Sequence, residues 1–250
     1  MENLSLNVPA GVLVKTTCVD FPGLVAGSFF LKGCNLRCPY CYNINLVTPS
    51  EKTDLELDSI QDLFNHLEKR QGILTGLVIS GGEPLLNPYT PLIIKKAKSL
   101  GYKIKLDTNG TLPAELSYFL EAPELRPDFL AIDIKTTPEK YAKLICNKQS
   151  KLYGNIQYFE KVISESCRIA ESIPADKREF RTVLVPSLVS LKEIQIIAKF
   201  LPKDASWQFA QFQNENCLNP EYKTIQPYLD YEIEQIITEA KKFIPNANLR

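Results

Sequence analysis

The sequence predicts an α/β fold in which the strands of a parallel sheet alternate with crossover helices. Short apolar runs and segments with helical spacing alternate about six times along the chain. Polar residues follow the ends of four successive predicted strands, as they do where parallel strands form a barrel with its functional side chains on one rim. A length of 250 residues suits one such barrel, so we expect a single domain over residues 1–250 with a core from about 14 to 222.

Continuous apolar runs predict the strands, because parallel strands are buried on both faces. A short first strand is expected around Val12 and Val14. The later strands are expected at 24–31, 76–80, 102–106, 128–132, 179–185 and 206–212.

Apolar residues at helical spacing predict the helices between these strands. Two of them begin at capping-box patterns, Asp58 with Gln61 and Ser190 with Glu193. The other helices are expected at 89–100, 113–120, 155–173 and 228–244. The polar stretch 135–155 is expected to be a mobile or partner-contacting loop, and residues 42–55 an irregular segment.

The composition is that of a globular protein without a charged partner. Basic and acidic residues both number 29, so nothing favours nucleic acid or an anionic membrane as a partner. The longest apolar runs are too short to span a bilayer, and no secretory signal pattern is present, so we expect a cytoplasmic protein. Seven cysteines in such a protein indicate metal or redox use rather than disulfides.

Three cysteines, Cys34, Cys38 and Cys41, follow the strand at 24–31. Close thiolates bind soft and borderline metals, and three protein ligands leave one position open for chemistry. Structural zinc would need a fourth ligand, either a distant cysteine or the only histidine, His66, which lies in a helical pattern. A self-contained electron carrier would need four cysteines per cluster. A 4Fe–4S cluster with one open iron therefore fits the count best.

The other four cysteines form no second cluster motif. They are Cys18, Cys146, Cys167 and Cys217. Cys167 has helical spacing and is expected in the core, as is Trp207.

The polar residues at the strand ends are weak signals when taken singly. Gly81-Gly82-Glu83 could be a plain turn, and Asp107 or Asp133 could be a helix cap. Because parallel strands end at one rim, we expect these residues and the cysteine loop to gather there.

The Cys-x3-Cys-x2-Cys loop, with Tyr40 before its last cysteine, resembles that of the radical S-adenosylmethionine (SAM) superfamily. Further motifs resemble the activating proteins of anaerobic ribonucleoside-triphosphate reductase, relatives of pyruvate formate-lyase activating enzyme. These motifs lie at 20–23, 80–84, 106–110, 131–135, 179–186 and 211–217. The resemblance covers nearly the whole chain, from about residue 14 to residue 222.

The resemblance implies a partial (β/α)6 radical SAM barrel with a 4Fe–4S cluster and SAM as cofactors. Such an enzyme reductively cleaves SAM to a 5′-deoxyadenosyl radical, works anaerobically and is inactivated by oxygen. In the activating proteins the radical takes hydrogen from a glycine of a partner glycyl radical enzyme, here an anaerobic ribonucleoside-triphosphate reductase. A flavodoxin or ferredoxin would supply the electron.

Site residues follow by position in the motifs. Cys34, Cys38 and Cys41 would hold the cluster, and Tyr40 would lie near the adenine of SAM. The amino group of SAM would be held by Gly81, Gly82 and Glu83, and its ribose or carboxylate by Asn109 and Arg181. The residues that would surround a monovalent cation are Asp107, Thr108 and Asp133, with Lys135 beside them. An internal ion pair between Lys135 and an aspartate is the alternative for that lysine.

The sequence departs from the activating proteins at two histidines. Tyr42 follows the third cysteine where many of them have histidine, and Gln208 or Gln211 occupies the region of a histidine on the last strand. Two other functions stay open: a radical SAM enzyme acting on a small molecule, similar to 7-carboxy-7-deazaguanine synthase, and a metal-stabilised binding protein. A pocket closed by residues 136–155 or by the C-terminal helix would favour the small-molecule enzyme.

Overall fold

The computed structural model describes residues 4–48 and 56–250, and these form two compact units. The first unit comprises the described parts of 1–35, 45–108 and 117–129. The second comprises 36–44, 109–116 and 130–250.

The first unit is built on a sheet with the strand order β3-β1-β2-β4-β5. Its strands are β1 (Pro9–Thr17), β2 (Ala26–Leu31), β3 (Asp58–Ser59), β4 (Gly76–Gly81) and β5 (Lys103–Thr108). β1 runs antiparallel to β2 and β3, whereas β2, β4 and β5 are parallel. Leu31 pairs with Gly81, and Ile79 pairs with Leu106, so the carboxyl ends of the three parallel strands are aligned. The rim expected from the sequence is therefore present within this unit.

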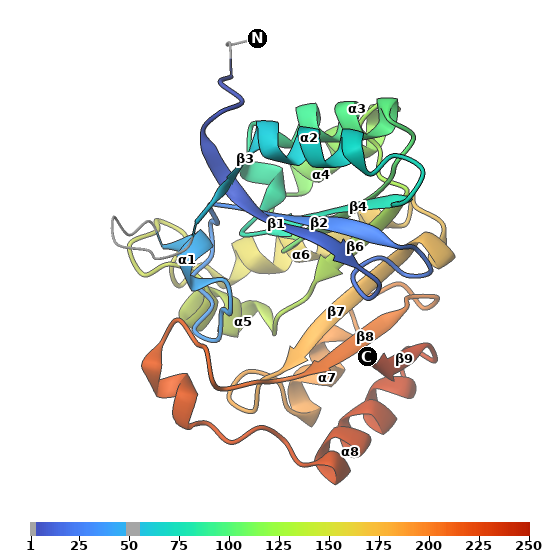
Figure 1. Ribbon diagram of the computed structural model, residues 1–250. Coiled ribbons are helices and arrows are strands. Elements are labelled where there is room, and N and C mark those ends of the chain that lie inside the picture. The colour runs from blue at the N-terminus through green and yellow to red at the C-terminus, as the bar shows by residue number, and fades with distance from the viewer. Residues whose placement is uncertain (1–3, 49–55) are drawn as a thin grey trace. The chain divides into compact units, whose positions relative to one another are not determined.

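Two helices, α2 (Ile60–Lys69) and α3 (Thr90–Ser99), lie side by side over one face of this sheet (Figure 1). The start of α2 differs from the prediction. Its N-cap is Ser59, which forms a capping box with Asp62, rather than Asp58 with Gln61. Asp58 is used elsewhere, because its Oδ2 accepts a hydrogen bond of 2.8 Å from the N–H of Leu13 on β1.

The second unit has four parallel strands in the order β6-β7-β8-β9. They are β6 (Phe129–Asp133), β7 (Arg178–Leu184), β8 (Trp207–Gln211) and β9 (Ala247–Leu249). The sequence did not predict β9, which is too short to carry an apolar pattern. Trp207 is fully buried in this sheet, as predicted, and its indole N–H donates to Thr182 Oγ1 at 3.0 Å.

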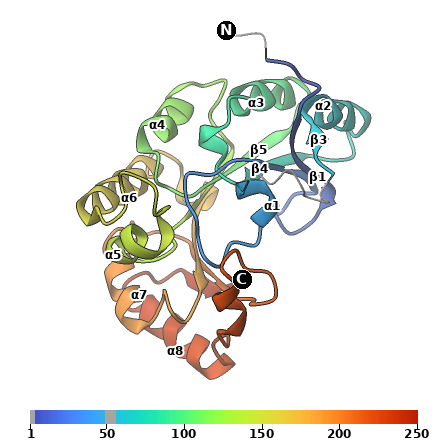
Figure 2. The ribbon, with the colours of Figure 1, turned by 90° about the vertical axis from the view of Figure 1, so that its left-hand side faces the viewer.

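Helical segments connect and flank these strands. In Figure 1, α7 (Leu191–Ile197) and α8 (Asp230–Lys241) lie side by side, and Figure 2 shows α5 (Pro138–Lys140) next to α6 (Ile156–Ala170). The predicted capping box of Ser190 and Glu193 is confirmed at the start of α7. Shorter segments are α1 (Ile44–Val47), α4 (Pro113–Glu121) and the turns η1 (Pro84–Leu86), η2 (Tyr141–Ile145), η3 (Ala175–Lys177) and η4 (Pro220–Thr224).

The segment 135–155, expected to be a loop, is partly helical. It contains α5 and then η2, a turn of π-helix. Tyr141, Ala142 and Ile145 are fully buried, and this apolar packing explains why the turn forms in a polar stretch.

The six strands predicted from 24–31 onward are present as β2, β4, β5, β6, β7 and β8, with ends that differ by no more than two residues, whereas β3 and β9 were not predicted. Residues 49–55 of the predicted irregular segment lie outside the described residues. Within the part of the chain that the structure describes, no helix has the length and apolar character needed to cross a membrane.

Candidate cofactor site

The cysteine loop is divided between the two units. Cys34 belongs to the first unit, and Cys38 and Cys41 belong to the second. All three cysteines are free of disulfides. Backbone hydrogen bonds hold the loop on both sides: Gly33 N–H donates to Leu46 O at 2.7 Å, and Arg37 N–H donates to Ile145 O at 2.9 Å. The loop is therefore anchored through its main chain.

The thiol chemistry of this loop suits an iron–sulfur cluster. Among residues 4–48 and 56–250, no three His, Cys, Asp or Glu side chains form a preassembled group for a metal ion. The cluster therefore fits by the chemistry of its donors, which are three cysteine thiols outside any disulfide, at the spacing of an iron–sulfur loop. Cys167 lies on the buried face of α6. Burial raises the pKa of its thiol to about 12, in keeping with its predicted structural role.

The end of β4 lies directly against the start of the cysteine loop. Gly82 N–H donates to Leu31 O at 2.8 Å, and Glu83 N–H donates to Gly33 O at 2.8 Å. A Cβ on Gly82 would lie 1.9 Å from Gly33 O, and Gly81 has a φ of +115°. Only glycine allows this approach. The two glycines thus join the predicted SAM-binding motif to the predicted cluster loop.

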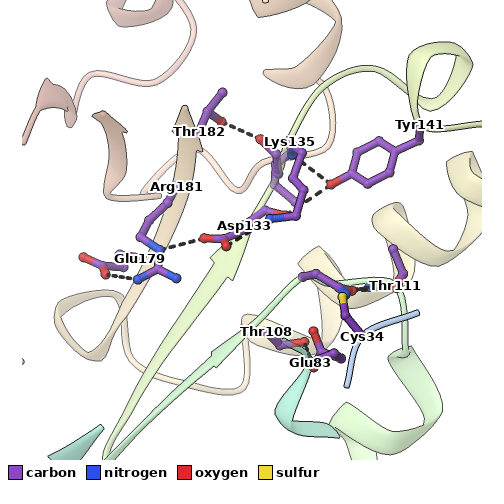
Figure 3. Close-up of polar contacts among 12 residues, drawn as sticks. Cys34, Glu83, Thr108, Thr111, Asp133, Lys135, Tyr141, Glu179, Arg181 and Thr182 are labelled. Carbon is purple, nitrogen blue, oxygen red and sulfur yellow. Dashed lines mark hydrogen bonds and ion pairs between the residues drawn. The ribbon is translucent and has the colours of Figure 1, made fainter. Parts of the chain in front are cut away.

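Glu83 is a buried carboxylate held at this junction. Only 1% of the surface of this residue is exposed to solvent. Glu83 Oε1 accepts hydrogen bonds from Leu85 N–H at 3.1 Å and from Thr108 Oγ1 at 2.8 Å (Figure 3). A carboxylate fixed in this way suits the ammonium group of an amino acid ligand. The assignment of Glu83 to the SAM amino group stays a prediction that this geometry fits.

In the second unit, Asp133 lies between two cations (Figure 3). Arg181 Nε is 2.7 Å from Asp133 Oδ1, and Lys135 Nζ is 3.2 Å from Asp133 Oδ2. Burial raises the pKa of Asp133, but Arg181 and Lys135 outweigh burial and hold this pKa well below its usual range. Burial lowers the pKa of Lys135, and the Asp133 carboxylate more than offsets it, so the pKa lies above its usual value. The structure therefore contains the Lys135–aspartate ion pair that was the alternative for this lysine.

Tyr141 fixes the backbone of Asp133 and Lys135, a role that the sequence analysis did not predict. Its hydroxyl accepts a hydrogen bond from Lys135 N–H at 2.8 Å and donates to Asp133 O at 3.2 Å. Burial raises the pKa of Tyr141, so its hydroxyl stays protonated at neutral pH.

A cavity of about 230 Å³ opens beside the ion pairs of Asp133, within the second unit. Asp133 pairs with Arg181 in the sheet register, and Arg181 pairs with Gln208, so the three side chains share one face. Arg250 N–H donates to Phe209 O at 2.8 Å and extends the ladder of β9 to the cavity. The full lining is Tyr40, Asp133, Lys135, Arg181, Thr182, Val183, Gln208, Phe209, Ala210 and Arg250.

The structure places the other predicted residues as follows. Tyr40 is buried and lines this cavity. Asn109, also buried, turns its side-chain carbonyl to Thr111, whose N–H and hydroxyl donate to it at 3.0 and 2.6 Å. Their contacts with SAM stay predictions.

The structure shows what the residues at the two positions without histidine contact. Tyr42 Oη accepts a hydrogen bond of 2.9 Å from Gln213 N–H, so this hydroxyl holds the segment after β8. Of the two glutamines considered, Gln208 lines the cavity, whereas Gln211 Nε2 donates to Tyr228 O at 3.2 Å. Of these two glutamines, Gln208 is therefore the one that lies at the cavity.

The two aspartates expected around a monovalent cation are already ion-paired with basic side chains. Asp107 Oδ1 is 2.6 Å from Lys105 Nζ in the first unit, and Asp133 is paired with Lys135 and Arg181 in the second. This donor set does not fit an added metal cation, because its carboxylates are balanced by side chains.

Comparisons with known proteins agree with this chemistry. Residues 28–163 match the Radical SAM superfamily. A protein of Methanocaldococcus jannaschii named "putative glycyl-radical enzyme activating enzyme" is 27% identical over 245 residues, which cover 95% of this chain and 94% of that protein. The 7-carboxy-7-deazaguanine synthase of Aquifex aeolicus is 31% identical over 167 residues, or 66% of this chain and 69% of that protein.

A solved structure of TYW1 with a lysine-pyruvate adduct bound has the same fold. It aligns with a TM-score of 0.59 and 13% identity, covering 88% of this chain and 74% of its own. The predicted α/β fold with parallel strands and outer helices is confirmed. Because the family match spans more than half of the chain and includes the cysteine loop, this protein belongs to the radical SAM superfamily.

Proposed function

We propose that this protein cleaves SAM reductively and uses the resulting radical to activate a glycyl radical enzyme. The observation that carries the first part is the junction of Gly82 with Gly33, which joins a fixed carboxylate, Glu83, to the cysteine loop. The similarity to a glycyl-radical enzyme activating enzyme over nearly the whole of both chains supports the second part.

The chain's own residues divide the work. Cys34, Cys38 and Cys41 hold a 4Fe–4S cluster through thiolates. When bound and reduced, the cluster supplies the electron that cleaves SAM to methionine and a 5′-deoxyadenosyl radical. Glu83 accepts hydrogen bonds from the SAM ammonium group, with carbonyl groups of Gly81 and Gly82 beside it.

The second unit positions the rest of SAM. Tyr40 presents a buried ring for the adenine, and Arg181 presents a guanidinium for the ribose or carboxylate. Asn109 is proposed as a further contact to the ribose or carboxylate. Asp133 holds Arg181 and Lys135 in place by ion pairs, which leaves less side-chain freedom to lose when SAM binds.

The hydrogen atom comes from a glycine Cα of a partner glycyl radical enzyme, and an anaerobic ribonucleoside-triphosphate reductase is the partner we propose. A flavodoxin or ferredoxin supplies the electron in the cytoplasm. The partner's glycine loop must reach the SAM site, so the rim has to accept a protein segment.

A second candidate is a small-molecule radical SAM enzyme, and the similarity to 7-carboxy-7-deazaguanine synthase favours it. We expected its pocket to be closed by residues 136–155 or by the C-terminal helix. The lining of the cavity beside Arg181 includes no residue from 136–155 or from α8, although Arg250 reaches it from the end of β9.

Anaerobic reconstitution with iron, sulfide, reductant and SAM tests both candidates together. The proposal predicts about four irons per chain, the content of a 4Fe–4S cluster, and 5′-deoxyadenosine formation. It also predicts a glycyl radical in the electron paramagnetic resonance (EPR) spectrum of the partner reductase. SAM cleavage with formation of a 7-carboxy-7-deazaguanine product and no radical on the reductase would favour the second candidate. Absence of iron would instead leave a binding protein.

A further inference from the structure

Lys105, in the middle of β5, is a buried lysine at the proposed SAM site. Only 1% of its side chain is exposed, and its Nζ lies 2.6 Å from Asp107 Oδ1. The two residues are two apart on one strand, so their side chains project from the same face of the sheet. Lysine is almost never fully buried unless it is paired. The pairing with Asp107 therefore accounts for the burial of this lysine.

Apolar side chains lie close to Lys105. The Phe129 ring centroid is 5.9 Å from Lys105 Nζ, within the range of a cation–π contact. Val78 pairs with Lys105 in the register of β4 and β5 and packs in an apolar cluster with Phe129 and Phe21. An ammonium group in such a place is retained only where a carboxylate compensates its desolvation. Lys105 and Asp107 are thus a neutral buried pair.

Each aspartate of the expected cation site is already ion-paired with a basic side chain. In the first unit, Asp107 is paired with Lys105, and Thr108 donates its hydroxyl hydrogen to Glu83. In the second unit, Asp133 is paired with Lys135 and Arg181, and Arg181 Nη1 also lies 3.8 Å from Glu179 Oε1. A monovalent metal ion would compete with these basic side chains for the same carboxylate oxygens.

We propose that the Lys105 ammonium group is the resident cation of this site and replaces a bound metal ion beside Asp107. It fixes the orientation of the Asp107 carboxylate without potassium or sodium. The inference concerns the SAM site of the proposed function, but it rests only on the buried pair and does not depend on the partner enzyme.

Two variants separate the charge of Lys105 from the space that it fills. Lys105→Met removes the charge and keeps most of the volume. Lys105→Ala removes the charge and also leaves room for an ion or water next to Asp107. Lys103→Ala is the matched control, because Lys103 lies on the same strand and is ion-paired with Asp128 at 2.8 Å, but its side chain is 63% exposed.

The reconstituted protein is compared in potassium chloride and in choline chloride at equal ionic strength. The readouts are the melting temperature, the potassium retained after desalting, and SAM cleavage. Wild type and Lys103→Ala should give the same values in both salts and retain no potassium. Both Lys105 variants should melt about 10 °C lower in choline, since they remove the ammonium group that is ion-paired with the buried Asp107 carboxylate. Potassium should restore part of this loss in Lys105→Ala only.

The outcomes decide the proposal in either direction. Loss of stability or of SAM cleavage in wild type on replacing potassium by choline, with recovery on adding potassium, would overturn it. A Lys105→Ala variant that responds to potassium no more than Lys103→Ala would also overturn it. If neither Lys105 variant folds, retained potassium and salt dependence in the wild type still decide. Failure to activate a reductase would leave these readouts unchanged, so the two proposals fail separately.

Discussion

Gly82 and Gly33 are in backbone contact so close that a methyl group on Gly82 would lie 1.9 Å from the Gly33 carbonyl oxygen. This contact fastens the end of β4 to the loop that carries the cysteines. Glycine is required at position 82 because no side chain fits there. The link between the two predicted cofactor motifs is therefore a property of the backbone as well as of the side chains.

Gly82→Ala should lower the free energy of unfolding by about 3 kcal/mol, since the backbone must move to admit the methyl group. It should also reduce the iron bound on reconstitution. Gly27→Ala in β2 is the control, because the nearest atom to its Cβ would be 3.7 Å away. Urea unfolding and iron analysis of both variants make the comparison. Equal behaviour of the two would show that the contact between Gly82 and Gly33 is not needed.

Cys38→Ala should abolish the visible absorbance of the 4Fe–4S cluster, because each cluster thiolate is proposed to bind one iron. Cys167→Ala should keep this absorbance, since Cys167 packs in the protein core from the buried face of α6. Absorption spectra after anaerobic reconstitution test both variants. Loss of the cluster from Cys167→Ala, with a folded protein by circular dichroism, would show that the ligands are wrongly assigned.

The ion pairs of Asp133 should make stability depend on pH in one direction. Arg181 and Lys135 hold the pKa of Asp133 below its unfolded-state value of roughly 3.9, so the pairs stabilise the fold above that pH. The stabilisation is lost as the pH falls through the lower folded-state pKa. Asp133→Asn should cost about 2 kcal/mol at pH 7, a value reduced for partial exposure.

Urea unfolding at pH 7, 4 and 3 measures this difference between wild type and Asp133→Asn. The difference should shrink from pH 7 to pH 3. Asp176→Asn serves as the control, because its ion pair with Lys177 is exposed and should contribute little at any pH. A difference for Asp133→Asn that grows toward low pH would contradict the account.

Tyr141→Phe should lower the free energy of unfolding by about 1 to 2 kcal/mol, because the backbone N–H of Lys135 loses its acceptor. The affinity for SAM should fall as well, because Lys135 and Asp133 lose their common anchor. Tyr118→Phe, at a position that is 58% exposed, should change neither quantity. Calorimetry of SAM binding and urea unfolding report the two effects. An unchanged affinity would show that Tyr141 supports the fold alone.

The sequence predicted the parallel strands well because burial on both faces leaves continuous apolar runs. It missed Lys105, since Lys103, Lys105 and Asp107 alternate with apolar residues as on a strand with one solvent-facing side. Asp107, two residues away, was the one feature that indicated an internal ion pair. It also placed the cap of α2 at Asp58, because both Asp58 and Ser59 are good caps. The contact of Asp58 with Leu13, distant in sequence, decided between them. Arg250 could not be foreseen, because β9 is too short to carry a pattern.

The EPR spectrum of the partner tests the central claim most directly. The reconstituted protein is mixed anaerobically with reductant, SAM and an anaerobic ribonucleoside-triphosphate reductase, and Cys38→Ala is treated in the same way. We predict a glycyl radical signal on the reductase with wild type and none with Cys38→Ala. Formation of 5′-deoxyadenosine by the wild type without any radical on the reductase would contradict the proposed activating function.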